Sequence, residues 1–277
     1  RPEAMRAFVE QHRARAAGCL AEVGRLCDVV ITMLPNGRVV REVVLGEPGG
    51  RGENGEEKDS LVAGMQPGSV LVDMSSSSPV GTRELGRELA ARGIAMLDAP
   101  VSGAVKRAQS GTLAIMVGGD PAVAERCRPL LEAMGQSIFL TGPLGSGHAL
   151  KALNNLVSAA GLIAAAEALL IGQKFGLDPQ VMIDVFNSST ARNNSTENKF
   201  KQFILSRSFA SGFSLDLMVK DLTTAVELAQ ATDTPAPFGS LCRELWAAAQ
   251  AQLGRGEDHT AVVKWLERLA GVELAGG

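Results

Sequence analysis

A lysine stands among polar side chains at the start of an otherwise apolar helical segment. The pattern begins GSGHALKALNN at Gly145 and stays rich in Ala and Leu to about Phe175. At about 100° per residue, one arc of this helix collects the polar side chains His148, Lys151, Asn154, Asn155 and Ser158. A polar stripe on an apolar helix must face water, a partner or a ligand. The helix dipole opposes a positive charge near the helix start and weakens its hold on a proton, so Lys151 is a candidate general acid or base. The plainer alternative is a lysine that reaches solvent from a buried helix, with the asparagines capping neighbouring elements.

Polar signatures also follow the short apolar runs in the first half of the chain. They are Thr32–Pro35 (TMLP), Asp73–Ser76 (DMSS) and Asp98–Gly103 (DAPVSG). Open α/β sheets bind ligands at the carboxyl ends of their strands, although each signature alone also fits a turn or a helix cap. Ser102 and Gly103 can present a hydroxyl and backbone N–H groups to a carboxylate, because glycine lets the backbone approach closely.

The elements that carry these signatures alternate between strand and helix up to about residue 143. We expect strands at 28–34, 69–74, 94–97, 113–117 and 137–140, and helices at 79–92 and 121–134. The early strands are almost continuously apolar, as parallel strands covered on both faces are. This pattern predicts a doubly wound α/β sheet.

Only helices are expected after Gly142-Pro143. Their predicted ranges are 147–175, 179–188, 196–206, 215–232, 237–253 and a last one after Asp258. We therefore expect an α/β domain over 1–143 and an all-helical domain over 144–277, joined by the long helix that carries Lys151. Residues 47–60 form a polar, Gly-rich stretch that we expect to be a surface loop.

Composition excludes several kinds of partner and site. With 277 residues, a net charge of −3 and no tyrosine, the chain lacks a bulk basic surface and the usual base-stacking platform, so we expect no nucleic-acid partner. The four cysteines form no Cys-x-x-Cys pair and have no histidine at zinc spacing, so we expect no metal site and a reducing, cytoplasmic location.

No membrane segment is expected. The chain opens RPEAMR, which lacks the apolar run of a signal peptide. Residues 152–171 approach the length of a membrane span, but Asn154, Asn155, Ser158 and Glu167 interrupt them and no aromatic belt flanks them. We expect a closely packed helix in a core or a subunit interface.

Taken together, the order and spacing of these pieces resemble the β-hydroxyacid dehydrogenase family, which includes 3-hydroxyisobutyrate dehydrogenase and tartronate semialdehyde reductase. The resemblance runs from residue 1 to about 270. Its matching pieces are DVVITMLP at 28–35, DMSS at 73–76 with Pro79, DAPVSGA at 98–104, GTLAIMVGG at 111–119, Gly147 with Lys151, Asn154 and Asn155, and KDL at 220–222.

The resemblance implies a Rossmann-like domain, a nicotinamide cofactor and a role for individual residues. It implies that Lys151 is the catalytic lysine, that Ser102 and Gly103 anchor the substrate carboxylate, and that Asn155 orients the substrate. It further implies that Phe213 and Asp221 line the closed site. The cofactor contacts that it implies are Leu34, Pro35, Ser76 and Lys220.

Two departures from the family pattern bear on these expectations. The Gly-x-Gly-x-x-Gly turn that cradles the cofactor pyrophosphate is not found in the sequence. Either the sequence omits the first βα unit of a longer protein, which we expect, or the protein is a fragment with a weakened cofactor site. If Arg1 matches the arginine that often ends the second strand, it favours NADP over NAD. Ala104 stands where Ser-Gly-Gly is usual, and its methyl group would narrow the carboxylate pocket.

We therefore expect an oxidoreductase that transfers a hydride between NAD or NADP and a small β-hydroxy acid or its semialdehyde, and that forms a homodimer or homotetramer. The alternatives are a catalytically silent binding protein of the same fold and a relative of imine reductases, which usually have another residue at the Lys151 position. The sequence does not select the hydroxy acid.

Overall fold

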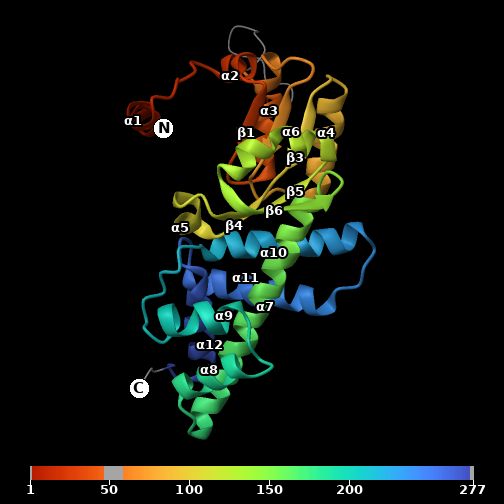
Figure 1. The fold of residues 1–277 in the computed structure, drawn as a ribbon. Coiled ribbons are helices and arrows are strands. Elements are labelled where there is room, and N and C mark those ends of the chain that lie inside the picture. Colours follow the sequence, from red (N-terminus) through yellow and green to blue (C-terminus); the bar gives the residue numbers. More distant parts are fainter. Residues whose placement is uncertain (1, 47–58, 275–277) are drawn as a thin grey trace. The chain divides into compact units, whose positions relative to one another are not determined.

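The structure is a computed structural model that describes residues 2–46 and 59–274. Its chain divides into two compact units, one made of Arg1–Val101 and Ala114–His148, the other of Ser102–Leu113 and Ala149–Gly277. The boundary expected after residue 143 stays a prediction. In this division Ser102–Leu113 belongs to the helical unit and the sheet unit extends to His148. Figure 1 labels the elements of both units. The predicted loop at 47–60 lies almost wholly outside the described residues.

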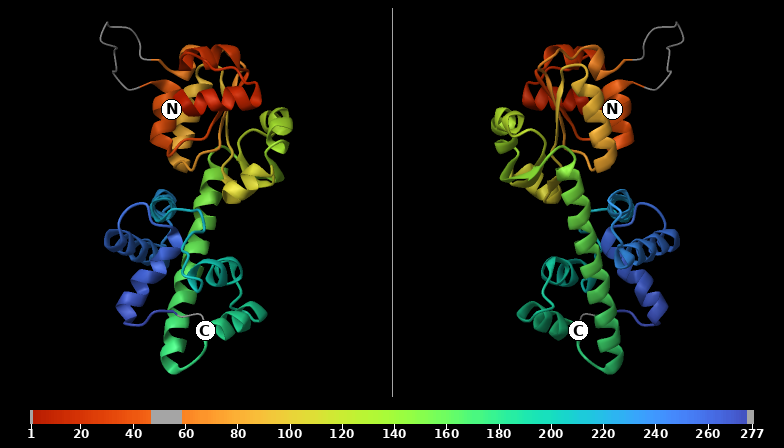
Figure 2. Two further views of the ribbon diagram at one scale, coloured as in Figure 1. Left: turned by 90° about the vertical axis from the view of Figure 1, so that its left-hand side faces the viewer. Right: turned by 90° about the vertical axis from the view of Figure 1, so that its right-hand side faces the viewer.

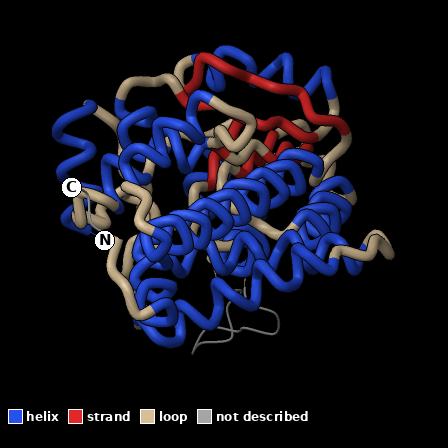
Figure 3. The backbone as a smooth tube through the Cα atoms, turned by 90° about the horizontal axis from the view of Figure 1, so that it is seen from below, coloured by secondary structure: helices blue, strands red, loops and turns tan. Residues whose placement is uncertain are grey.

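The first unit contains a mixed sheet with the strand order β1-β2-β3-β5-β4, with β6 paired to β5. Figure 3 shows these strands gathered together, in red. The bounds of the strands are β1 Val29–Thr32, β2 Val70–Asp73, β3 Ala95–Asp98, β4 Val101–Ser102, β5 Leu113–Gly118 and β6 Gly135–Gly142. The strands β1, β2 and β3 are parallel as expected, whereas β5 pairs antiparallel to β3 through Gly118 and Asp98.

The register of the parallel strands decides where polar groups meet. Thr32 is paired with Asp73, and Asp73 with Asp98, so three polar residues stand side by side where β1, β2 and β3 end. All three are buried, although the strands are otherwise apolar. The carboxyl edge of the sheet therefore holds a buried polar row.

The sheet unit also contains helices. Their bounds are α1 Pro2–His12, α2 Leu20–Leu26, α3 Gly37–Leu45, η1 Leu61–Ala63, α4 Pro79–Ala90 and α6 Pro121–Glu132. The sequence predicted α4 and α6, which begin with proline, but not α1, α2 or α3. In α3 the Asn36 side chain caps the helix by accepting a hydrogen bond from the Val39 N–H at 3.0 Å. Helix α4 packs on β3, and α6 packs on β3 and β6.

The second unit is helical apart from part of β4. Its bounds are α5 Ala104–Gln109, α7 Ser146–Phe175, α8 Pro179–Ser188, α9 Asn194–Asn198, η2 Phe200–Ile204, α10 Leu215–Ala231, α11 Pro237–Leu253, η3 His259–Ala261 and α12 Val262–Ala270. Helix α7 runs without a break in both views of Figure 2. The short α5 was not predicted.

One predicted helix, 196–206, is wrong in detail. The structure has the short α9 followed by η2, a π-helical turn in which the Leu205 N–H donates to the Phe200 carbonyl at 2.8 Å. The wider turn places both Phe200 and Ile204 in the core with no exposed surface. Burial of these two side chains stabilises a turn that helix propensity alone disfavours.

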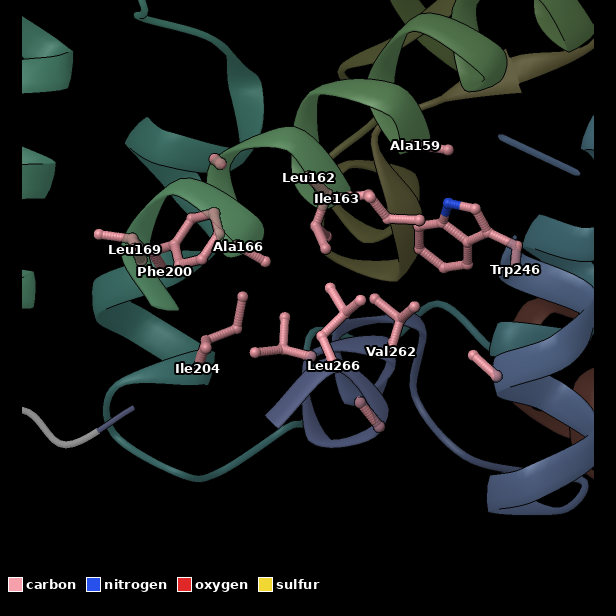
Figure 4. Close-up of a cluster of buried hydrophobic side chains, with 14 of the residues drawn as sticks. Ala159, Leu162, Ile163, Ala166, Leu169, Phe200, Ile204, Trp246, Val262 and Leu266 are labelled. Carbon is pink, nitrogen blue, oxygen red and sulfur yellow. The ribbon is translucent and has the colours of Figure 1, made fainter. Parts of the chain in front are cut away.

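Trp246 and Phe200 are the largest side chains buried in the helical unit. Figure 4 shows Trp246, from α11, next to Ala159 of α7, and Phe200 next to Leu169 and Ala166 of the same helix. Small residues on α7 make room for these rings. Among the described helices, α7 is long and apolar enough to cross a membrane by length and composition. Half of its most apolar window is buried inside the structure, as in a core helix.

Gly147 is a position in the first turn of α7 where the chain tolerates no side chain. A Cβ atom there would overlap the carbonyl oxygen of Met116 and lie 3.0 Å from that of Asp98. We expect Gly147→Ala to lower the free energy of unfolding of the sheet unit by about 1–3 kcal/mol, as overpacking does. Gly81→Ala in α4 is the control, since its Cβ would meet only the Ser78 Cβ at 3.9 Å. It should be neutral or stabilising by up to about 1 kcal/mol. Urea denaturation of both variants tests this, and equal behaviour would contradict it.

Candidate active site

Asp73, at the end of β2, organises the loop after that strand. Its carboxylate has no exposed surface and accepts hydrogen bonds from the Thr32 hydroxyl at 2.9 Å, the Ser75 N–H at 3.0 Å and the Ser77 hydroxyl at 2.7 Å. The Ser75 hydroxyl in turn accepts from the Leu34 N–H at 2.9 Å. Burying a carboxylate without such donors would destabilise the folded protein by several kcal/mol. The hydrogen bonds therefore hold the carboxyl ends of β1 and β2 in one arrangement.

Asp98, at the end of β3, receives the start of α7. Its two carboxylate oxygens accept from the Gly145 N–H and the His148 N–H, both at 2.7 Å. N–H groups at a helix start have no partner within the helix, and an anion also suits that end of the helix dipole. Asp98 therefore fixes the beginning of the helix that carries Lys151.

His148 lies inside the sheet unit rather than on a ligand-facing stripe. It is 1% exposed, its Nε2 is 3.0 Å from the Ser75 carbonyl oxygen and its Nδ1 is 2.8 Å from the Thr82 hydroxyl. A carbonyl oxygen only accepts, so Nε2 carries a proton. The carboxylates of Asp73 and Asp98 each approach a ring nitrogen to 3.7 Å. His148 therefore does not share a ligand-facing surface with Lys151, contrary to the prediction from the sequence. Instead it lies between the ends of β2 and β3 at the start of α7.

Leu34, Pro35 and Ser76 occupy the carboxyl edge beside this network. Leu34 and Ser76 are half-buried and Pro35 is exposed, and the neighbouring Met33 is 64% exposed. The flat face of a nicotinamide ring can pack on accessible apolar side chains, and its carboxamide needs polar partners, so an edge that offers both suits it. The residues present therefore fit the expected cofactor on this side. Arg1, the expected discriminator of NADP, lies outside the described residues.

The sheet unit also contains a pocket of about 570 Å³. It is lined by Gly119, Asp120 and Pro121 at the start of α6, by Gly142–Leu144, and by Val117 and Leu140. None of these residues is among those expected to contact cofactor or substrate, so this pocket does not mark the expected site.

In the helical unit, α7 and α10 bring a second polar group together. Asp221 of α10 is 3% exposed and accepts from the Asn155 side-chain amide at 2.5 Å. The Lys220 ammonium forms an ion pair with the same carboxylate at 3.1 Å. Asn154 donates to the Asn155 side-chain oxygen at 3.2 Å. The asparagines of α7 and the Lys220–Asp221 pair of α10 therefore form one cluster, although Asn155 and Asp221 are 66 residues apart in the sequence.

Lys151 has an altered affinity for its proton. Burial lowers the pKa of Lys151 below its ordinary value; the charge of Asp221 acts in the opposite direction, and that of Lys220 adds to the lowering. Desolvation is the largest of these causes, so the helix dipole considered from the sequence is not needed to explain the direction. An amine whose pKa is lowered gives up its proton more readily than an ordinary lysine, as a general acid or base must.

Ser102 and Gly103 form a tight turn between β4 and α5. Both are half-buried, Gly103 has φ 132° and Ala104 has φ 54°. The first angle requires glycine, and the second strains an alanine. The sequence considered only the volume of the Ala104 methyl group and missed this strain, because φ depends on how the chain enters α5.

Phe213 contacts His259 rather than the cluster around Asp221. Its ring meets that of His259 edge-on, with centroids 5.6 Å apart, and its carbonyl accepts from the His259 N–H at 2.8 Å. In the described part of the chain, no hydrogen bond, ion pair or ring contact connects Phe213 to Lys151, Asn155 or Asp221.

Two family models together cover most of the chain. The NAD-binding domain of 6-phosphogluconate dehydrogenase matches residues 1–142, and the NAD-binding domain of NADP-dependent 3-hydroxyisobutyrate dehydrogenase matches residues 145–266. Among curated proteins, 2-(hydroxymethyl)glutarate dehydrogenase of Eubacterium barkeri is 38% identical over 99% of this chain and 88% of its own length. The 2-hydroxy-3-oxopropionate reductase of Escherichia coli K12 is 38% identical over 92% of this chain and 83% of its own.

Solved structures agree with these matches. The 3-hydroxyisobutyrate dehydrogenase of Mycobacterium tuberculosis with L-serine has a TM-score of 0.77 and 36% identity, covering 89% of this chain and 81% of that one. An imine reductase of Streptomyces aurantiacus, at 17% identity and a TM-score of 0.55, shares the fold alone. The chain belongs to the β-hydroxyacid dehydrogenase family and is an NAD(P)-dependent oxidoreductase of small hydroxy acids.

Proposed function

We propose that Lys151 is the general acid and base in the interconversion of a small β-hydroxy acid and its semialdehyde. The observation that carries this proposal is a half-buried lysine whose pKa is lowered by desolvation, near the hydrogen-bonded Asn155 and Asp221. The nicotinamide ring, when bound, takes up or supplies the hydride. In the sheet unit, Leu34, Pro35 and Ser76 are the proposed cofactor contacts; in the helical unit, Lys220 is a further proposed contact.

Lys151 serves both directions by changing its protonation state. In oxidation its neutral amine accepts the proton of the substrate hydroxyl; in reduction its ammonium polarises the carbonyl and protonates the forming alkoxide. Asp221 favours the ammonium, while burial favours the amine. A reversible reaction requires both states, and these two influences act on the pKa of Lys151 in opposite directions.

Ser102 and Gly103 anchor the substrate carboxylate in this proposal. In the described part of the chain, the N–H of Gly103 donates to no backbone carbonyl and no side chain, so it is available to a ligand oxygen. Asn155 holds Asp221 through its amide, so its share in orienting the substrate would be exerted through its side-chain oxygen or through Asp221. Phe213 stays a proposed lining residue of the closed site.

The proposal covers small β-hydroxy acids as substrates and NAD or NADP as cofactor. The relatives named above act on different compounds, from 2-(hydroxymethyl)glutarate to 2-hydroxy-3-oxopropionate. NADP is the favoured cofactor only through Arg1. A silent binding protein of this fold would need no lysine with a lowered pKa, so cofactor binding without turnover on every hydroxy acid would support that alternative.

A homo-oligomer in the cytoplasm completes the proposal. In the helical unit, α7 exposes Val157, Ile171 and Phe175 at 73%, 71% and 85%. Such side chains on a helix rich in small residues suit a second copy of the chain. The four cysteines are all unpaired, as in proteins of a reducing compartment.

Substitution of Lys151 tests the proposed chemistry. We expect Lys151→Ala to lower kcat by about 10²–10⁴-fold, the usual contribution of a positioned general acid or base. The melting temperature and the cofactor affinity should change little. Lys151→Arg keeps the charge but cannot release a proton at neutral pH, so it should stay inactive. Lys174→Ala, at the exposed end of α7, is the control and should keep full activity. Near-normal turnover of Lys151→Ala with NAD or NADP would rule out the mechanism.

The pH profile tests the electrostatic account. Oxidation needs neutral Lys151, so its rate should rise as pH increases through the lowered pKa of this residue, below the ordinary lysine range. Asp221→Asn removes the charge that raises that pKa, so the acid limb of kcat/KM should move to lower pH. Glu227→Gln, an exposed change on the same helix, should leave the limb in place. A shift to higher pH in Asp221→Asn would contradict the assigned sign.

Light scattering tests the oligomer. At micromolar concentration we expect at least twice the mass of one chain, and Ile171→Glu should reduce that mass because it places a charge in the apolar surface of α7. Phe8→Glu, at an exposed phenylalanine of α1, is the control and should leave the mass unchanged. A monomer mass for the unsubstituted protein would remove the claim.

A further inference from the structure

Arg107 of α5 covers the turn that the proposed function uses as the carboxylate anchor, Ser102–Ala104. A Cβ atom built on Gly103 would have Arg107 as its nearest neighbour, with Cδ at 2.5 Å, Cβ at 2.6 Å and Cγ at 3.0 Å. Side chains on a helix lean back toward its start, which explains why the Arg107 stem lies over the residue four positions earlier. In arginine the guanidinium is bonded to Cδ, so the positive charge of Arg107 lies close to the Ser102–Ala104 turn.

The position of the Arg107 backbone is fixed by two hydrogen bonds. Its N–H donates to the Gly103 carbonyl at 3.3 Å, and its own carbonyl accepts from the Thr112 N–H at 2.9 Å. The closing end of α5 is held further by Ser110, whose hydroxyl pairs with that of Thr112 at 2.7 Å. The stem therefore starts from a defined place, while the charged end is exposed.

No acidic residue of the protein neutralises this charge within the described part of the chain. Arg107 and the adjacent Lys106 form no ion pair or side-chain hydrogen bond there, and residues 101–113 contain no Asp or Glu. The acids nearest in sequence are occupied, Asp98 by the start of α7 and Asp120 by capping of α6. Helix α5 therefore carries two cations that no acidic residue of the described chain pairs with.

A single carboxylate does not need Arg107, because Ser102 and the free N–H of Gly103 already offer it donors. A cation beside that anchor suits an additional anion carried on the same substrate, since a guanidinium binds carboxylate and phosphonate oxygens in pairs. We infer that Arg107 makes the site selective for β-hydroxy acids with a second anionic group, the dicarboxylate class. This inference rests on the proposed function and adds a specificity-determining residue to it.

Matched pairs of substrates test the preference for diacids separately from the proposed dehydrogenase function. The pairs are 2-(hydroxymethyl)succinate with 2-(hydroxymethyl)butanoate, and 2-(hydroxymethyl)glutarate with 2-(hydroxymethyl)pentanoate. Within each pair a methyl group replaces the distal carboxylate, so the reacting end is unchanged. We expect kcat/KM of the unsubstituted enzyme to be at least about tenfold higher for the diacid in one pair, the usual size of a hydrogen bond to a charged group.

Arg107→Met keeps the stem over Gly103 and removes the charge. It should raise KM for the preferred diacid by about 10–100-fold and leave kcat and the monoacid KM within about twofold. Arg107→Lys should recover part of the preference. Lys106→Met is the control, since it removes the same charge from α5 without touching Gly103, and it should leave the preference unchanged.

The other outcomes overturn the inference in distinguishable ways. If Arg107→Met raises KM equally for diacid and monoacid, Arg107 binds the shared carboxylate. If it raises only the KM of the nicotinamide cofactor, Arg107 belongs to the cofactor site. If the unsubstituted enzyme oxidises both members of each pair equally, the dicarboxylate class is wrong while the proposed function stands. If it oxidises none of these or other hydroxy acids, the proposed function itself fails.

Discussion

Two carboxylates without access to water, those of Asp73 and Asp98, must obtain all of their hydrogen bonds from the protein. An unpaired buried carboxylate costs several kcal/mol, so the surrounding chain is arranged to supply donors. Asp73 receives them from the ends of β1 and β2, and Asp98 receives them from the first turn of α7. His148 contacts the loop after β2 and the first turn of α4, and lies between the two carboxylates. The start of the helix that carries Lys151 is thereby defined to within hydrogen-bond distances.

In the helical unit a buried carboxylate influences the charge of a lysine. Asp221 is a buried carboxylate of this unit that lies near two lysines and also receives an amide donor from Asn155. Lys220 forms the direct ion pair with Asp221, so the carboxylate is shared and cannot fully compensate the charge of Lys151. Burial then decides the direction of the Lys151 pKa. A proton that is loosely held on a buried amine is what acid–base chemistry on a hydroxyl requires.

The turn at Ser102–Ala104 contains backbone strain. Ala104 adopts a left-handed conformation that costs a non-glycine residue about 1–2 kcal/mol, and Gly103 adopts an angle open only to glycine. The surrounding hydrogen bonds of α5 hold this conformation in place. Strain of this kind is tolerated where a backbone must approach a ligand, which agrees with the role proposed for these residues.

The sequence by itself determined the architecture and the family. Apolar runs, proline-led helices and the glycine after α7 predicted β1–β3, α4, α6, α8 and α11 closely, because these signals act over a few neighbouring residues. The motif spacing selected Lys151, Ser102, Gly103, Asn155 and Asp221 through the family resemblance.

Tertiary structure alone decided how those residues are used. The role of His148 depends on Thr82 and Ser75, 66 and 73 residues away, and no local pattern records such pairings. The π-helical turn at Phe200–Ile204 exists because both side chains must reach the core, which overrides the ordinary helix that the pattern predicts. Arg107 became visible only when its stem was found over Gly103. Burial and hydrogen-bond partners are properties of the folded chain, so pKa values and side-chain roles follow from the fold rather than from residue order.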